Sequence, residues 1–138
     1  VYKRQLGART YVLRKTFKFE ASHQLVDHDG KCARLHGHSW EFTIMISVSG
    51  PSPLIGEGPK RNMVMDFYDV GVVGKEIENL LDHQHLNNVL SETMPTSEFL
   101  AEWIWDQCEA NSALNPVLYG IDVKETCTSG CLLTRAPE

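Results

Sequence analysis

The sequence predicts an α+β domain: a four-stranded antiparallel sheet with two helices inserted between its second and third strands. Two observations predict this class. Apolar and polar residues alternate with a period of two in the first part of the chain and again near its C-terminus, as half-buried strands do. Between these parts, apolar residues recur at helical spacing. Because paired strands flank a helical insertion, we expect both helices on one face of the sheet.

The first two strands are predicted from alternation, and the segments that bound them are predicted loops. In the first strand the apolar positions are Leu13, Phe17, Phe19 and Ala21. In the second they are Trp40, Phe42, Ile44, Ile46 and Val48. Residues 24–35 are polar, and residues 50–62 contain three glycines and three prolines, so both segments are expected to be loops.

Two helices are predicted from start signals and apolar spacing. Asp66 is the expected N-cap of the first, and Pro95-Thr96-Ser97-Glu98 is the start signal of the second. The expected inward residues of the first helix are Phe67, Val70, Val73, Ile77 and Leu80 or Leu81. Those of the second are Leu100, Trp103, Ile104 and Cys108. Two short strands complete the fold, one with Tyr119, Ile121 and Val123 on one face and one over residues 131–134.

Composition and charge narrow the functional classes. The 138 residues fit a single domain, 1–138, in which residues 1–10 are expected to lie outside the core. A net charge of −5 argues against a general nucleic-acid or anionic-membrane binder. No apolar run approaches the roughly 20 residues of a membrane span. No secretory signal is visible, and a core of this size needs no disulfides, so we expect a cytoplasmic protein with reduced thiols.

A metal site is predicted from the segment Cys32-Ala33-Arg34-Leu35-His36-Gly37-His38 together with His23. Histidines two apart on a strand project to the same side, and His23 shares the parity of the apolar residues on the expected neighbouring strand. Three imidazoles with an open position are typical of a catalytic zinc site. If Cys32 is a fourth ligand, the site is closed and structural instead; the sequence permits either role.

Two further features lie outside this segment. Asp82 precedes His83 at the expected end of the first helix, where the pair is either a proton relay or ordinary helix-end polarity. Glu125 continues the parity of Ile121 and Val123, which places a carboxylate on an apolar face unless the end of the strand is exposed.

In order along the chain, these motifs resemble the 6-pyruvoyltetrahydropterin synthase superfamily, the tunnelling-fold pterin enzymes. The resemblance covers residues 16–133 and rests on the motifs Phe-Glu-Ala-Ser-His, Cys-Ala-Arg-Leu-His-Gly-His, Asp-Phe, Leu-Asp-His, Asn87, Pro-Thr-Ser-Glu and Val-Lys-Glu-Thr. The short spacing from Cys32 to His36, and the segments 103–107 and 124–131, are similar to the bacterial 6-carboxytetrahydropterin synthases of queuosine biosynthesis.

The resemblance implies a reaction and the residues that carry it. A Zn²⁺-dependent lyase would convert 7,8-dihydroneopterin triphosphate to 6-carboxy-5,6,7,8-tetrahydropterin, acetaldehyde and triphosphate. His23, His36 and His38 would be the zinc ligands, Cys32 the base, and Asp82 with His83 the relay. Glu125 would anchor the pterin, with Thr96 and Thr126 as lesser contacts. The family also implies a homo-oligomer with active sites between subunits, which agrees with the open sheet edges expected here.

Three alternatives stay open at this point. A 6-pyruvoyltetrahydropterin synthase would stop before cleavage of the side chain. A non-catalytic pterin- or purine-binding module would keep the fold and the metal as structure. A closed structural zinc module would bind the Cys32 sulfur to the metal. Of the other cysteines, Cys108 is expected in the core, while the roles of Cys127 and Cys131 are open.

Overall fold

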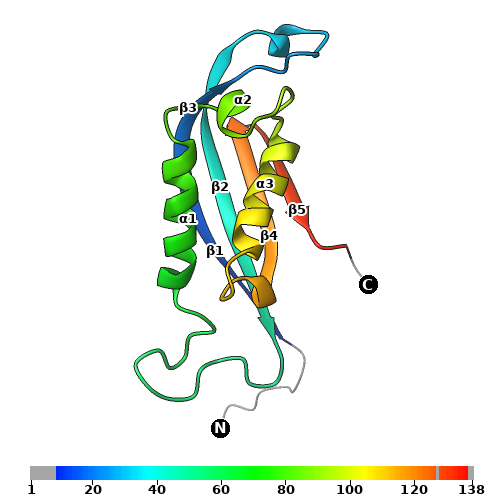
Figure 1. Cartoon of the computed structure of the whole chain (residues 1–138). Helices are drawn as coiled ribbons and strands as arrows, with labels where there is room; N and C mark the ends of the chain where they lie inside the picture. The colour runs from blue at the N-terminus through cyan, green and yellow to red at the C-terminus, as the bar shows by residue number, and fades with distance from the viewer. Residues whose placement is uncertain (1–8, 127, 137–138) are drawn as a thin grey trace.

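The computed structural model describes residues 9–126 and 128–136 and has α+β architecture, as predicted (Figure 1). The strands are β1 Thr10–His23, β2 His36–Ser49, β3 Gln84–His85, β4 Leu118–Thr126 and β5 Ser129–Thr134. The helices are α1 Phe67–Leu81, α2 Leu86–Val89 and α3 Ser97–Glu109, with 3-10 turns at Lys31–Ala33 (η1) and Asn115–Val117 (η2). Thr10, the first residue of β1, is exposed and pairs with Ser49.

The sheet has five strands in the order β3-β1-β2-β4-β5, so the predicted count of four strands and two helices is wrong. All neighbours are antiparallel except β3, which pairs in parallel with β1. Strand β3 is two residues long, and α2 is four residues long. Neither is long enough to establish a period in the sequence, which is why both were missed. The two expected helices and four expected strands are all present.

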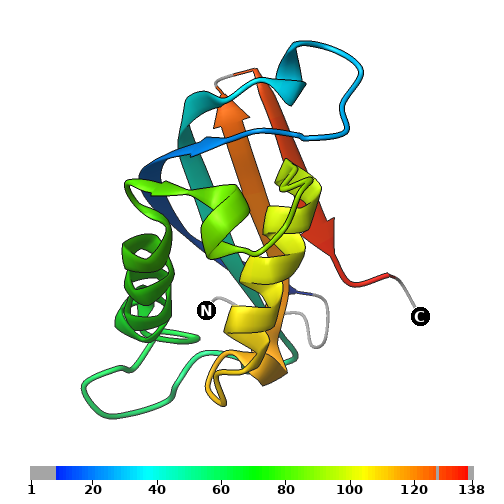
Figure 2. The ribbon, with the colours of Figure 1, turned by 45° about the horizontal axis from the view of Figure 1, so that its top comes forward.

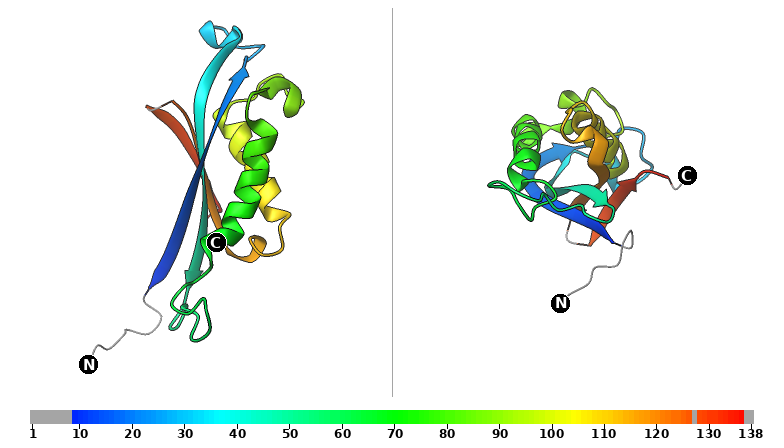
Figure 3. Two further views of the ribbon diagram at one scale, coloured as in Figure 1. Left: turned by 90° about the vertical axis from the view of Figure 1, so that its left-hand side faces the viewer. Right: turned by 90° about the horizontal axis from the view of Figure 1, so that it is seen from below.

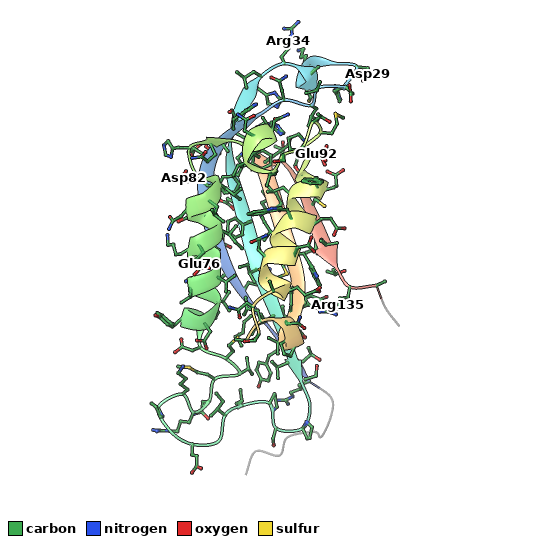
Figure 4. The ribbon with its side chains drawn as sticks, viewed as in Figure 1. Asp29, Arg34, Glu76, Asp82, Glu92 and Arg135 are labelled. Carbon is green, nitrogen blue, oxygen red and sulfur yellow. The ribbon has the colours of Figure 1, made fainter. Side chains whose placement is uncertain are left out.

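The helices cover one face of the sheet, and none of the described elements covers the other (Figure 3, left). Helix α1 packs on β1, and α3 packs on β4 and β5 (Figure 2). The β1–β2 hairpin is longer than this helical layer. Its loop, which carries η1, extends beyond the ends of the helices, and Asp29 and Arg34 lie at its tip (Figure 4). No helix among the described residues combines the length and apolar character that crossing a bilayer requires.

The core lies between the covered face and the helices. Opposite residues of β1 and β2 point inward together, and the rings of Phe17 and Phe42 stack at 5.1 Å between centroids. A Cβ added to Gly74 of α1 would lie 2.0 Å from Cζ of Phe17. Because glycine has no Cβ, Gly74 lets this helix approach the sheet closely. Cys108 is fully buried, as predicted, and burial raises the pKa of its thiol to about 12.

Two inward assignments are wrong at the ends of elements. Phe67 opens α1 and is 47% exposed. Of the two alternatives Leu80 and Leu81, Leu81 is the buried one, as the prediction allowed. In β4, Tyr119 is 43% exposed and Leu118 is buried instead. The register shifts between Met45 and Ile46, so one residue of β4 is passed over and the alternation changes phase there.

Candidate metal centre and pterin site

Three histidines meet where β1 ends and β2 begins. His23 lies opposite His36, and His38 lies opposite Ala21, in the same antiparallel register that pairs Phe19 with Trp40. Alternation along both strands therefore directs all three imidazoles to the face that holds the core, as their parity predicted. Trp40 closes the inner side of the cluster, with its ring 5.0 Å from that of His23 and 5.3 Å from that of His38.

The imidazoles are arranged as a candidate metal site. One ligand atom from each of His23, His36 and His38 lies within 4.8 Å of the others. The ring planes are steeply inclined to one another, with centroids 4.5 to 5.2 Å apart, so their edges rather than their faces converge. The Cys32 thiol is not part of this group. The donor set is thus three nitrogens, which fits an open metal site better than a closed structural one.

Hydrogen bonds at the far side of two rings fix their orientation. Nδ1 of His23 lies 2.9 Å from the carbonyl oxygen of Pro95, and Nδ1 of His36 lies 2.7 Å from that of Arg34. In each pair the ring N–H donates to the carbonyl, which leaves Nε2 with a free lone pair. This is the arrangement that metal-binding histidines adopt.

Two buried nitrogens supply an independent test of fit. Among the described residues, Nε2 of His23 and Nε2 of His38 are buried side-chain atoms without a hydrogen-bond partner. Buried polar atoms normally have a partner, and a metal ion would satisfy both of these. Burial lowers the pKa of His23 and of His38. Both rings are therefore held in the neutral form that binds metals. The residues present fit a metal ion.

Glu125 lies beside the histidines. Its Oε2 accepts a hydrogen bond of 2.6 Å from the hydroxyl of Ser97, and its Oε1 lies 3.8 Å from Nε2 of His38. The side chain is 28% exposed, so the carboxylate is half-buried and not free at the end of the strand. A carboxylate fixed on one oxygen next to three imidazoles can receive a polar ring edge from a bound molecule.

The remaining predicted site residues are Thr96, Thr126 and Cys32; of these, Thr96 and Cys32 form no hydrogen bond with the three histidines or with Glu125 in the described part of the chain. Thr96 is the N-cap of α3, where its hydroxyl accepts a hydrogen bond of 3.1 Å from the N–H of Phe99. The side chain of Thr126 and the whole of Cys127 lie outside the described residues. Cys32 is half-buried in η1, within the loop that leads from His23 to His36, and its carbonyl accepts a hydrogen bond from the N–H of Leu25.

Asp82 and His83 form a second pair of polar side chains, outside the group of three metal-ligand atoms. Oδ2 of Asp82 lies 2.9 Å from Nδ1 of His83, and Oδ1 accepts a hydrogen bond from the N–H of Glu20. That N–H and His83 lower the pKa of Asp82. Asp82 follows the end of α1 (Figure 4), and the ring of His83 is 80% exposed. His83 lines a cavity together with Ser22, Ser39 and His38.

Sequence reasoning missed the groups that orient the site. Ser97 was read as part of a helix start, yet it is 7% exposed and donates to Glu125. The carbonyls of Pro95 and Arg34 hold two of the imidazoles. Every residue has a backbone carbonyl, so the sequence does not show which carbonyls accept hydrogen bonds from the imidazoles. The one available signal for Ser97 is its place beside Thr96 in the motif that begins α3.

Comparison with known proteins gives one family. The family model described as 6-pyruvoyl tetrahydropterin synthase matches residues 12–136. A 6-carboxy-5,6,7,8-tetrahydropterin synthase from a Synechocystis strain is 40% identical over 120 residues, which is 86% of this chain and 89% of that protein. A protein of the same name from Bacillus subtilis is 25% identical over 96% of this chain and 90% of its own length.

Solved structures agree with the fold. The Caenorhabditis elegans 6-pyruvoyl tetrahydropterin synthase superposes with a TM-score of 0.77 at 20% sequence identity, covering 93% of this chain and 97% of that one. The family match and the relatives of high coverage confirm the predicted resemblance and the predicted enzyme class. The chain belongs to the 6-pyruvoyl tetrahydropterin synthase family.

Proposed function

We propose that the chain is a zinc-dependent lyase of the cytoplasm that converts 7,8-dihydroneopterin triphosphate, with one water molecule, to 6-carboxy-5,6,7,8-tetrahydropterin, acetaldehyde and triphosphate, a step of queuosine biosynthesis. The observation that carries the proposal is the convergence of His23, His36 and His38, two of them with buried Nε2 atoms that lack a partner, beside the carboxylate of Glu125. The relatives named 6-carboxy-5,6,7,8-tetrahydropterin synthase favour this product over 6-pyruvoyltetrahydropterin.

The three histidines would hold the zinc ion. When bound, zinc would act as a Lewis acid that lowers the pKa of the substrate's hydroxyl groups. The chain's own contribution is to keep the rings neutral and oriented. Burial disfavours protonation of His23 and His38. The carbonyls of Pro95 and Arg34 fix which nitrogen of His23 and of His36 faces inward.

Glu125 would bind the pterin ring by accepting hydrogen bonds from its 2-amino group and N3–H. The hydroxyl of Ser97 already donates to Oε2, which limits the rotation of the carboxylate before substrate arrives. Thr96 precedes Ser97, and Thr126 follows Glu125; both are retained as lesser contacts in the proposal. Because Oε1 of Glu125 lies 3.8 Å from Nε2 of His38, a pterin ring bound to this carboxylate would lie next to the metal site.

Cys32 would be the base that removes a carbon-bound proton from the substrate side chain. Both ends of the loop that carries it are anchored, since the residue before the loop is His23 and the strand after it begins with His36. The thiol is half-buried and stands outside the group of metal-ligand atoms, which supports a role for it as the base and not as a fourth ligand.

Asp82 and His83 would act as the relay from a second copy of the chain. Within one chain, His83 lines a cavity with His38 and with Ser22 and Ser39, whose side chains alternate with those that face the core. The uncovered sheet face and the unpaired outer edge of β5 (Figure 3) are surfaces through which copies can associate. In such a homo-oligomer, one copy supplies the metal and the pterin carboxylate and its neighbour supplies the acid.

Product analysis tests the proposed reaction. Zinc-loaded protein incubated with 7,8-dihydroneopterin triphosphate should release acetaldehyde and 6-carboxy-5,6,7,8-tetrahydropterin, identified by mass spectrometry. A 6-pyruvoyl product without acetaldehyde would assign the chain to the other branch of the family, and pterin binding without turnover would make it a binding module. Cys32→Ala should abolish turnover, whereas the matched variant Cys131→Ala, altered on β5, should retain it.

A further inference from the structure

Asn87, in α2, uses its side chain to hold one residue of a neighbouring segment. Its Oδ1 accepts a hydrogen bond of 2.9 Å from the N–H of Gln24, and its Nδ2 donates one of 2.7 Å to the carbonyl oxygen of the same residue. Both backbone groups of Gln24 are thus paired with a single carboxamide. Gln24 directly follows His23, the last residue of β1.

Asn87 lies where the backbone hydrogen bonds between β1 and β3 end, so a side chain is needed to pair with the next residue after β1. The β1–β3 ladder consists of the pairs Ala21↔Gln84 and Ser22↔His85, and the chain then turns into α2. The carboxamide of Asn87 takes over where the backbone ladder stops, because an amide group offers the same donor and acceptor as a peptide unit. It extends the pairing of β1 past the metal ligand His23.

The same side chain also reaches the segment that orients His23. Nδ2 of Asn87 lies 3.5 Å from the carbonyl oxygen of Thr93, which accepts a hydrogen bond of 3.1 Å from the N–H of Val26. Two residues further on, the carbonyl of Pro95 holds Nδ1 of His23. Asn87 therefore lies between the backbone that carries His23 and the segment whose carbonyl sets the direction of its ring.

We propose that Asn87 is a positioning residue for the metal site. It holds the backbone next to His23 and the segment whose carbonyl orients the ring of His23, without contacting the metal. The inference rests on the metal site of the proposed function. A metal site binds tightly when its ligands are held in place before the ion arrives. Without the carboxamide, the end of β1 and the segment 93–95 lose their common anchor, and His23 samples directions that miss the shared ligand position.

Metal affinity and a spectroscopic signature test this role. Zn²⁺ affinity is measured by competition with a chromophoric chelator, and the visible absorption of the Co²⁺-loaded protein reports the ligand geometry. Asn87→Ala should weaken Zn²⁺ binding by about tenfold or more, in the range found for outer-shell partners of metal ligands, and should change the Co²⁺ spectrum. Asn88→Ala, which alters the exposed neighbour on α2, should bind as wild type.

A second variant keeps the test decisive if Asn87→Ala folds poorly. Asn87→Asp retains the acceptor for the Gln24 N–H but places an oxygen against the Gln24 carbonyl, so its affinity should also fall. Folded Asn87 variants with wild-type affinity and spectrum, even with a lower Tm of the metal-free form, would show that the residue is only structural. Wild-type protein that binds no zinc would instead overturn the metal site and, with it, this inference.

Discussion

The β1–β2 hairpin has two halves that share one geometry and differ in content. In the core half, defined by the pairs Phe17↔Phe42 and Phe19↔Trp40, the inward rings stack, with the planes of Phe19 and Trp40 inclined by 1°. In the site half, which contains His23, His36 and His38, the inward rings meet at 67° to 88°. Register and alternation are the same in both halves.

The difference lies in what each half gains from its surroundings. The core half is covered by the helical layer and buries carbon surface, which stabilises the fold. The site half leads into the loop that extends beyond the helices (Figure 1), and it buries nitrogen atoms that lack partners there. A buried polar atom without a partner is unfavourable for folding. One hairpin therefore separates stability from binding along its length, and variants in each half should have separable effects.

The largest effect is expected in the core half. Phe42→Ala removes a ring that is fully buried and stacked on Phe17, and it should lower the free energy of unfolding by about 3–5 kcal/mol. Urea denaturation of the metal-free protein measures this change. Leu35→Ala, at a position that is 64% exposed, is the control and should change stability by less than about 0.5 kcal/mol. A similar loss of unfolding free energy in both variants would contradict the assignment of stability to the core half.

The next effect is on binding and belongs to the site half. His38→Gln removes a ligand nitrogen and should weaken zinc affinity by more than the roughly 10–100-fold that loss of an outer-shell partner causes. The free energy of unfolding of the metal-free protein should change by less than about 1 kcal/mol, since the buried Nε2 has no partner to lose. Titration with zinc and urea denaturation separate the two quantities. His28→Gln, in the exposed loop, should bind zinc normally; equal loss in both variants would remove His38 from the site.

A pH effect should follow the site half alone. Burial lowers the pKa of His23 and His38 in the folded metal-free protein, so between those values and about 6.5, the usual histidine pKa, the unfolded chain binds more protons. Stability therefore rises with pH through this window, is fully present above about 6.5 and is lost as the pH falls below it.

The measurement is the free energy of unfolding of the metal-free protein from pH 7 downward. His38→Gln should flatten the profile, whereas Phe42→Ala should lower it at every pH and keep its slope. A wild-type profile that stays level below pH 6.5 would show that burial of these rings has no such energetic consequence.

The smallest effect is expected on the outward side of the core half. Thr16 and Thr43 face each other across the strands on the uncovered face, with their hydroxyl oxygens 2.7 Å apart. Thr16→Val keeps the β-branched shape and loses one exposed hydrogen bond, so the free energy of unfolding should change by less than about 0.5 kcal/mol. Thermal unfolding checks this; a loss comparable to that of Phe42→Ala would mean that another surface covers this face.

Local patterns determined most of the fold and the candidate metal-ligand group. The helix starts at Asp66 and Thr96 were predictable because an N-cap acts on the first turn, within a few residues. The direction of the three histidines was predictable because strand alternation is a property of the backbone itself. The short strand β3 and the phase change in β4 were not, since each is set by pairing with a distant segment.

Only the tertiary structure decided how the site is held. The contacts of Pro95 with His23, of Asn87 with Gln24 and of Ser97 with Glu125 join residues that lie far apart in the sequence. It also left Asp82 and His83 outside the group of three metal-ligand atoms, although His83 and His38 line one cavity. A sequence determines which donors and acceptors exist and which way a strand directs them. Which donor meets which acceptor depends on packing, because hydrogen bonds form only over short distances that folding alone brings about.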